Sequence, residues 1–315
     1  MGEQRKGYLF GIAAYVLWGF FPLYFKLLRP SGPLEILAHR VVWSALFVGV
    51  LLTLARSWRR IADLARRPRT LLVIGLAAVL IAVNWGTYIY GVNTARVVET
   101  SLGYFITPLI SVAFGLAVFG ERLRPARWAA LGVGTVAVAV LAVDYGRLPW
   151  IALTLAGSFA SYGLVKKRLG LPPTDGLFVE SAALAVPGLG YLAWLGAAGR
   201  STFTASPGHT MLLLVSGAVT AVPLLMFAAS ANRITMTGLG ILQYIAPILQ
   251  FFVGVAIEHE PMPAARLFGF ALVWLALVVF TWDGLRQSRR GARKVEPEPA
   301  RSDSAADAAP PVRIS

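Results

Sequence analysis

The first candidates for chemistry in this sequence are the few charged side chains that interrupt its apolar runs. Glu35, His39 and Trp43 recur every four residues, a spacing that places them on one face of a helix. Arg40 lies one position further round, and Lys26 shortly precedes the group. An ionisable group at the centre of a membrane costs about 2.5–3.5 kcal/mol or more, so its presence indicates a function. The pattern predicts that Glu35, Arg40 and Lys26 neutralise one another around a water-filled cavity, with His39 as a candidate proton carrier.

Depth along the apolar runs separates these candidates. Glu35 and Lys26 lie close to the ends of their runs, so their charged groups could instead extend to the lipid headgroups. A rise of about 1.5 Å per residue puts His39 and Arg40 some 8–9 Å deep, from where their side chains reach the lipid headgroups less easily. Glu99 begins a later run and joins Glu35 and His39 as a candidate site for a coupling proton.

A second polar group lies within other apolar runs. Asn84 and Tyr88 share one helical face and Trp85 is adjacent, while Gln243 and Tyr244 occur late in the chain. Asn84 and Trp85 are too deep for the belt of aromatic residues at a membrane surface. The group predicts a lining for a solute pathway, although Asn and Gln side chains can also simply join helices.

The sequence around these residues is that of a membrane protein. Of its 315 residues, 57% are hydrophobic and 14% are charged, against about 45–50% and about 25% in soluble domains. This composition excludes a disordered chain, and the basic residues lie between oily segments rather than on a folded face that could bind nucleic acid. The sequence contains no Cys, and its three His residues are scattered, so we expect neither a metal site nor a cofactor.

Ten apolar runs have about the 20-residue length of a membrane-spanning helix, so the expected fold is an all-α integral membrane protein. The runs cover approximately 8–28, 34–54, 71–91, 97–119, 126–143, 149–166, 177–196, 210–231, 236–257 and 265–283. Lys and Arg number 22 in the N-terminus, the even-numbered connections and the C-terminal tail, but five in the odd-numbered connections. The positive-inside rule therefore predicts that both termini lie in the cytoplasm.

An internal repeat divides the chain into two halves. A shift of 139 residues aligns Pro108 with Pro247 and Glu121 with Glu260, and a shift of 140 aligns Lys26 with Lys166. The sequence thus predicts an N-terminal segment (1–7), two five-helix repeats (8–143 and 149–283) and a disordered tail (284–315). Because five is odd, the repeats would enter the membrane in opposite senses.

Two further interpretations follow from this arrangement. The matched Pro108 and Pro247 could kink their helices and act as gates, or could serve packing only. Glu180, near the cytoplasmic end of its span, is expected to form an ion pair with Lys166 or Lys167.

Several segments resemble those of a known family. They are EILAHRVVWS (35–44), NWGTYIYGVN (84–93), ETSLGYFITPL (99–109), LGILQYIAPILQF (239–251) and the Glu121–Arg122–Leu123 segment. In this combination and order the chain resembles the RarD group of EamA-type permeases, in the drug/metabolite transporter superfamily, over about residues 7–285. The resemblance implies ten helices in two inverted repeats, a cytoplasmic-membrane location and export of a small solute. It does not supply a substrate.

We therefore expect a secondary transporter rather than an enzyme, with the substrate bound between the halves. Expected partners are a small solute, a coupling ion such as the proton and the lipid bilayer, with a homodimer as one assembly. The sequence has no phosphate-binding G-x-x-x-x-G-K-[ST] motif, which argues against an ATP-driven pump. A membrane-embedded enzyme acting on a lipid or isoprenoid, and a channel, remain alternatives.

Overall fold

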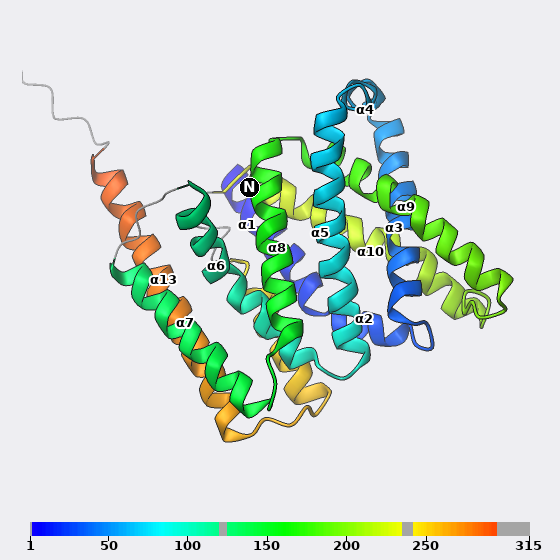
Figure 1. Cartoon of the computed structure of the whole chain (residues 1–315). Coiled ribbons are helices and arrows are strands. Elements are labelled where there is room, and N and C mark those ends of the chain that lie inside the picture. Colours follow the sequence, from blue (N-terminus) through cyan, green and yellow to red (C-terminus); the bar gives the residue numbers. More distant parts are fainter. Residues whose placement is uncertain (1, 120–124, 235–241, 295–315) are drawn as a thin grey trace, which may run out of the picture.

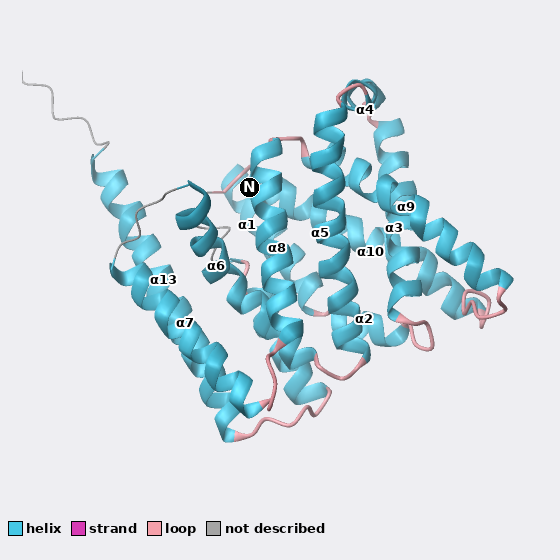
Figure 2. Cartoon of the chain, viewed as in Figure 1, coloured by secondary structure: helices cyan, strands magenta, loops and turns pink. Residues whose placement is uncertain are grey.

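The computed structural model describes residues 2–119, 125–234 and 242–294, and every regular element in these ranges is a helix (Figures 1 and 2). The earlier part of the chain forms α1 (Glu3–Gly19), α2 (Phe21–Leu27), α3 (Pro33–Leu54), α4 (Trp58–Ala65), α5 (Pro68–Asn93), α6 (Val97–Phe119) and α7 (Pro125–Asp144). The later part forms α8 (Trp150–Leu169), α9 (Pro173–Ala197), α10 (Pro207–Ala231), α12 (Ile245–Phe252), the π-helical turn η1 (Val253–Ile257) and α13 (Ala264–Lys294).

The helix boundaries follow from local chemistry. Pro33, Pro68, Pro173 and Pro207 each stand at the first position of a helix, where the missing N–H would have no partner within the helix anyway. At the other end of α8, Gly170 adopts φ +60, a left-handed conformation that ends helices and suits a residue without a Cβ. Within the described residues, the helices therefore begin and end close to the boundaries of the predicted apolar runs.

Several of these helices are long and apolar enough to cross a membrane. Among the described residues five helices meet this test, in α3, α5, α9, α10 and α13, and a sixth span results if α1 and α2 are taken together. Shorter apolar helices cover Val97–Ser111, Trp128–Asp144 and Ile245–Ile257. The chain is therefore a multi-pass membrane protein, and the ten spans remain a prediction.

The structure differs from the expected helices at three places. α1 and α2 meet at a bend of 43°, where Pro22 cannot donate the backbone hydrogen bond that would continue α1. The connection after α3 contains the short helix α4, in which Trp58, Ile61 and Leu64 recur every three residues with charged residues between them, a pattern that suits an interface rather than a core. α13 continues to Lys294, so the tail predicted to be disordered from residue 284 begins as a helix, because no Pro interrupts it before Pro297.

Helices from the two parts of the chain pack against one another throughout. α3 packs on α9 and α10, α5 on α8 and α9, α6 on α8 and α12, α1 on α10 and α12, and α7 on α13. Figure 1 shows the α7–α13 pair at one edge of the molecule and α9 at the other. Glycines allow the closest approaches: a Cβ on Gly217 of α10 would lie 2.2 Å from the carbonyl carbon of Trp43 in α3.

Candidate functional site

Arg40 is the residue around which the helices of both parts converge. Its side chain is 3% exposed, and its guanidinium carbon lies 4.9 Å from the ring centre of Phe25 and 4.7 Å from that of Trp85. Its one hydrogen bond to a described residue runs from Nε to Thr220 Oγ1 on α10, at 3.0 Å. Rings on the faces of a guanidinium supply cation–π attraction of about 2 kcal/mol or more when desolvated. They leave the N–H groups at its edge free to donate.

Tyrosine and asparagine side chains surround this arginine. The Phe25 ring, which faces Arg40, packs against Tyr24 and Tyr88 with centroids 5.6 Å and 5.9 Å apart, and Tyr88 packs against Tyr104 at 5.8 Å. Tyr24 donates to the carbonyl of Leu212 at 2.7 Å, whereas the buried Tyr88 hydroxyl has no hydrogen-bond partner among the described residues. A buried hydroxyl without a partner is costly, so Tyr88 presents unused hydrogen-bonding capacity beside a buried cation.

Asn84 joins three helices beside this group. Its Nδ2 donates to the carbonyl of Leu155 at 2.9 Å and to Ser158 Oγ at 3.1 Å, both on α8, and its Oδ1 accepts from Tyr104 on α6 at 3.2 Å. The side chain is 1% exposed and fully engaged. In this structure Asn84 links α5, α6 and α8, while the Trp85 ring lies against Arg40 and Tyr88 packs on Phe25.

The Glu35 cluster, formed by Ser31, Glu35, Ser201, Thr202 and His209, closes one end of the bundle. Glu35 Oε1 accepts from the Thr202 backbone N–H at 2.8 Å and Oε2 accepts from Thr202 Oγ1 at 2.9 Å. Ser31 Oγ lies 2.5 Å from Thr202 Oγ1 and 2.8 Å from His209 Nε2. These contacts tie the first turn of α3 to the loop between α9 and α10, which lies 167 residues later in the chain.

The Asp175 pair closes the opposite end. Asp175, in the first turn of α9, is 1% exposed and lies 3.2 Å from Nε of Arg60 on α4. A shift of 140 residues aligns Glu35 with Asp175, and it aligns the loop after α9 with the α4 segment. The 22-residue α3 is about 33 Å long, and because Glu35 lies in its first turn while α4 follows its last, the two contacts lie at opposite ends of the bundle.

The predicted mutual neutralisation of Glu35, Arg40 and Lys26 is wrong. Lys26 forms its ion pair with Glu258, in the segment before α13, and Glu35 bonds to Thr202. The bend between α1 and α2 carries Lys26 toward this later segment, a packing that spacing along the chain cannot reveal. Glu35 is 4% exposed, so its headgroup alternative is excluded as well.

His39 is held by two aromatic neighbours. Its ring stacks on Phe203 with centroids 5.0 Å apart, and Nδ1 accepts from the Trp43 indole at 3.2 Å, as the predicted shared face requires. Nε2 is buried without a partner among the described residues. Because Nδ1 accepts, the neutral ring carries its hydrogen on Nε2, and His39 could bind a further proton only at Nδ1, in place of the Trp43 hydrogen bond.

Two other acidic residues form hydrogen bonds with the first residues of helices at the same end of the bundle as Glu35. Glu99 accepts from Arg147 Nη2 at 2.8 Å and from the Ile151 backbone N–H at 3.3 Å. Glu260 accepts from the Val97 and Val98 backbone N–H groups at the start of α6, the latter at 3.0 Å. Burial raises the pKa of the Glu260 carboxyl, and those two hydrogen bonds oppose the rise.

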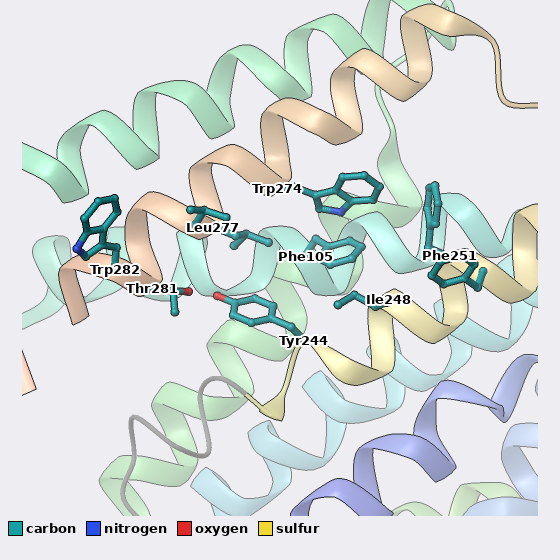
Figure 3. Close-up of a pocket in the computed structure, with 10 residues that line it drawn as sticks. Phe105, Tyr244, Ile248, Phe251, Trp274, Leu277, Thr281 and Trp282 are labelled. Atoms are coloured by element: carbon teal, nitrogen blue, oxygen red, sulfur yellow. The ribbon is translucent and has the colours of Figure 1, made fainter. Parts of the chain in front are cut away.

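The late polar residues of the predicted pathway lie elsewhere. Tyr244 bonds to Thr281 and Gln243 and lines an apolar groove of about 590 Å³ between α6, α12 and α13 (Figure 3). Phe105, Phe251 and Trp274 form much of its wall, and its side chains carry no charge. Gln243 and Tyr244 thus belong to a different cluster from Arg40.

The matched prolines also differ in setting. Pro108 lies inside α6, whereas α12 begins at Ile245 and puts Pro247 in its first turn, where a missing N–H breaks no helical bond. A role for either residue in gating stays a prediction. The predicted pair of Glu180 is confirmed, since Lys166 Nζ lies 2.7 Å from its Oε1. The Glu121 segment of the repeat lies outside the described residues.

Known proteins place this chain in a family. Residues 5–143 match the EamA-like transporter family. The RarD protein of Streptomyces exfoliatus is 54% identical over 295 residues, 93% of this chain and 94% of that protein. The chain belongs to the RarD family. RarD of Escherichia coli K12 is 38% identical over 92% of this chain and 99% of the relative. An uncharacterized transporter of Bacillus subtilis is 38% identical over 91% of this chain and 97% of the relative.

A solved crystal structure supports the fold. It matches 87% of this chain and 96% of its own with a TM-score of 0.58, at 21% sequence identity. Membership of the RarD family and the apolar helices together make the chain a membrane transporter of the EamA type.

Sequence reasoning missed the residues that the RarD-family chain uses as partners across its two parts. Thr202, Thr220 and Tyr104 carry no signal of their own, because Thr and Tyr are common in apolar helices and loops. Asp175 was detectable, since the 140-residue shift that pairs Lys26 with Lys166 also pairs it with Glu35.

Proposed function

We propose that this chain is a secondary transporter that exports a small solute by alternating access. In this proposal ten helices form two inverted repeats, 8–143 and 149–283, in the cytoplasmic membrane with both termini inside the cell. The distribution of Lys and Arg supports the orientation. The match of the EamA-like family to residues 5–143 supports the first boundary.

Helix packing supports the repeat. Each helix of the first proposed repeat has a counterpart in the second: α8 for α1, α9 for α3, α10 for α5, α12 for α6 and α13 for α7. If every helix is exchanged for its counterpart, the principal helix–helix contacts stay the same. The α1–α10 contact becomes α8–α5, and the α6–α8 contact becomes α12–α1, both of which occur. The contacts α3–α9, α6–α12 and α7–α13 map onto themselves. Such a twofold relation is typical of transporters built from inverted repeats.

The observation that carries the mechanism is the pair of contacts at opposite ends. Glu35 binds the α9–α10 loop at the proposed outer end, and Asp175 binds Arg60 at the proposed inner end. The two carboxylates occupy repeat-related positions, and each joins one half to the other. We assign them as an outer gate and an inner gate. Arg40 lies between the gates, so opening one while the other stays closed would expose it to one side only.

We also propose that a proton gradient supplies the energy. His39 and Glu260 are the groups best placed for this, because both lie near the outer end and neither forms an ion pair with a described residue. A proton added to His39 at Nδ1 would displace the Trp43 N–H beneath Phe203, and a proton on Glu260 would weaken its hydrogen bonds to the start of α6, so either would change contacts near the outer gate.

Counterflow in proteoliposomes tests this function. Solutes that raise the melting temperature of the purified protein would be loaded at high concentration, and entry of the labelled solute would be followed. Saturable exchange that is lost in Glu35→Ala and Asp175→Ala, and retained in Arg59→Gln, is expected. Arg59 is exposed on α4 beside Arg60, so it controls for loss of a charge at that end. Ohmic current, or conversion of the solute into a product, would contradict the proposal.

A further inference from the structure

The side chains around Arg40 have hydrogen-bonding capacity that the protein itself does not use. Of the five N–H donors on a guanidinium, one reaches Thr220, and no described carboxylate pairs with Arg40. The two lysines that lie within the predicted spans or at their ends do have such partners: Lys26 pairs with Glu258, and Lys166 with Glu180. Arg40 is also the one permanently cationic side chain among the buried residues that the structure describes.

We propose that Arg40 binds the carboxylate of a small organic monoanion, which is the substrate class of this transporter. The inference rests on the function proposed above and adds the chemistry of the substrate. A guanidinium edge matches a carboxylate with two parallel hydrogen bonds. The Tyr88 hydroxyl is buried without a partner among the described residues, and its ring packs on Phe25, which faces Arg40, so it supplies a further donor to the same anion.

Charge and surroundings define the rest of the ligand. One unpaired cation balances one negative charge, so a monocarboxylate fits better than a phosphate dianion, which would leave a charge uncompensated. Phe21, Phe25 and Trp85 lie with their ring centres 4.7–5.9 Å from the guanidinium carbon, so the site is apolar beyond the arginine. The remainder of the ligand is therefore a compact apolar body that contacts these rings.

The location suits a transported ligand. Arg40 donates to Thr220 on α10 and contacts Phe25 on α2 and Trp85 on α5, so both halves surround it. It lies about 7.5 Å along α3 from Glu35 of the outer gate. A carboxylate at this point would be released to the outside when the Glu35 cluster opens.

Thermal stability of the purified full-length protein tests the inference without a transport assay. Sodium benzoate and sodium hexanoate are compared with benzamide and hexanamide, with sodium chloride at equal ionic strength as the control. We expect the two carboxylates to raise the melting temperature in a saturable manner and the two amides and chloride to have no such effect. Equal stabilisation by the amides, or no saturable effect of either carboxylate, would overturn the proposal.

Variants locate the effect. Arg40→Gln should weaken carboxylate binding about tenfold or more, and Arg40→Lys, which keeps the charge but loses the fork, should fall between Arg40→Gln and the wild type. Arg59→Gln should bind as the wild type does. Tyr88→Phe removes one hydroxyl and should weaken binding several-fold, which keeps the test decisive if Arg40→Gln fails to fold. Wild-type affinity in Arg40→Gln, or in Tyr88→Phe where Arg40→Gln is unfolded, would overturn the proposal.

The two proposals fail separately. Carboxylate binding through Arg40 in a protein whose gates never alternate would refute transport and keep the binding site. Alternating gates without carboxylate preference would refute this substrate class and keep the transporter.

Discussion

Replacement of Gly217 by Ala tests whether α3 and α10 are in backbone contact across the two halves. The added Cβ would lie 2.2 Å from the Trp43 carbonyl carbon, 2.4 Å from its oxygen and 2.6 Å from the Ser44 nitrogen. Carbon atoms normally approach to about 3.5–4.0 Å, so the helices must separate by more than about 1 Å. All three obstructing atoms belong to the backbone, and none can rotate away.

The cost of this change can be worked out. Overpacking costs about 1–3 kcal/mol, and rigid backbone neighbours put Gly217→Ala at the upper end, about 3 kcal/mol. Ala is a better helix former than Gly by about 1 kcal/mol, which leaves a net loss of about 2 kcal/mol. Titration with SDS in mixed micelles, followed by circular dichroism, measures the free energy of unfolding.

A matched substitution controls for helix propensity. Gly190 lies within α9, and a Cβ there would meet nothing within 4 Å. Gly190→Ala should leave the free energy of unfolding unchanged or raise it by up to about 1 kcal/mol. If Gly217→Ala were as stable as Gly190→Ala, the close contact of α3 and α10 would be refuted.

Three further changes follow from the same structure. Arg147→Gln should lower the free energy of unfolding in SDS titrations by about 1–3 kcal/mol, because it leaves the buried Glu99 charge without its cation, while partial exposure of Arg147 screens the pair. Folding raises the pKa of the Glu260 carboxyl. The protonated carboxyl therefore contributes its full stabilisation at pH values below the pKa of the unfolded chain, about 4.3, and this stabilisation is lost as the pH rises through the pKa of the folded protein. Thermal unfolding across pH 4–7 should therefore show wild-type stability falling relative to Glu260→Gln as pH rises, and a parallel pH dependence would refute this. Asn84→Ala should cost about 1–2 kcal/mol in the same SDS titration by releasing Tyr104 and two acceptors on α8, and no loss would contradict the network.

Local features of the sequence predicted most of the helices. Apolar runs of sufficient length and prolines at their first positions define the elements, because both signals act within a few residues. The shared face of His39 and Trp43 was likewise predictable, since helical periodicity alone brings them together and the structure confirms their hydrogen bond.

Partners of the polar residues were not predictable in the same way. Lys26 appeared closest to Glu35 along the chain, yet its partner is Glu258, and Glu35 bonds to a loop 167 residues away. Such pairings depend on how the helices of the two halves interleave, which single-helix patterns do not contain. The repeat is the exception, because one shift relates Glu35 to Asp175 and so links the two ends of the molecule.

Labelling of a single cysteine tests alternating access most directly and requires no known substrate. The chain contains no Cys, so Thr220→Cys beside Arg40 would provide a unique thiol for a membrane-impermeant maleimide applied to either face of sealed vesicles. We predict that Asp175→Ala raises labelling from the cytoplasmic face and lowers it from the outer face. Glu35→Ala should do the reverse, raising labelling from the outer face and lowering it from the cytoplasmic face. Labelling that changes on the same face in both variants, or in neither, would contradict the account.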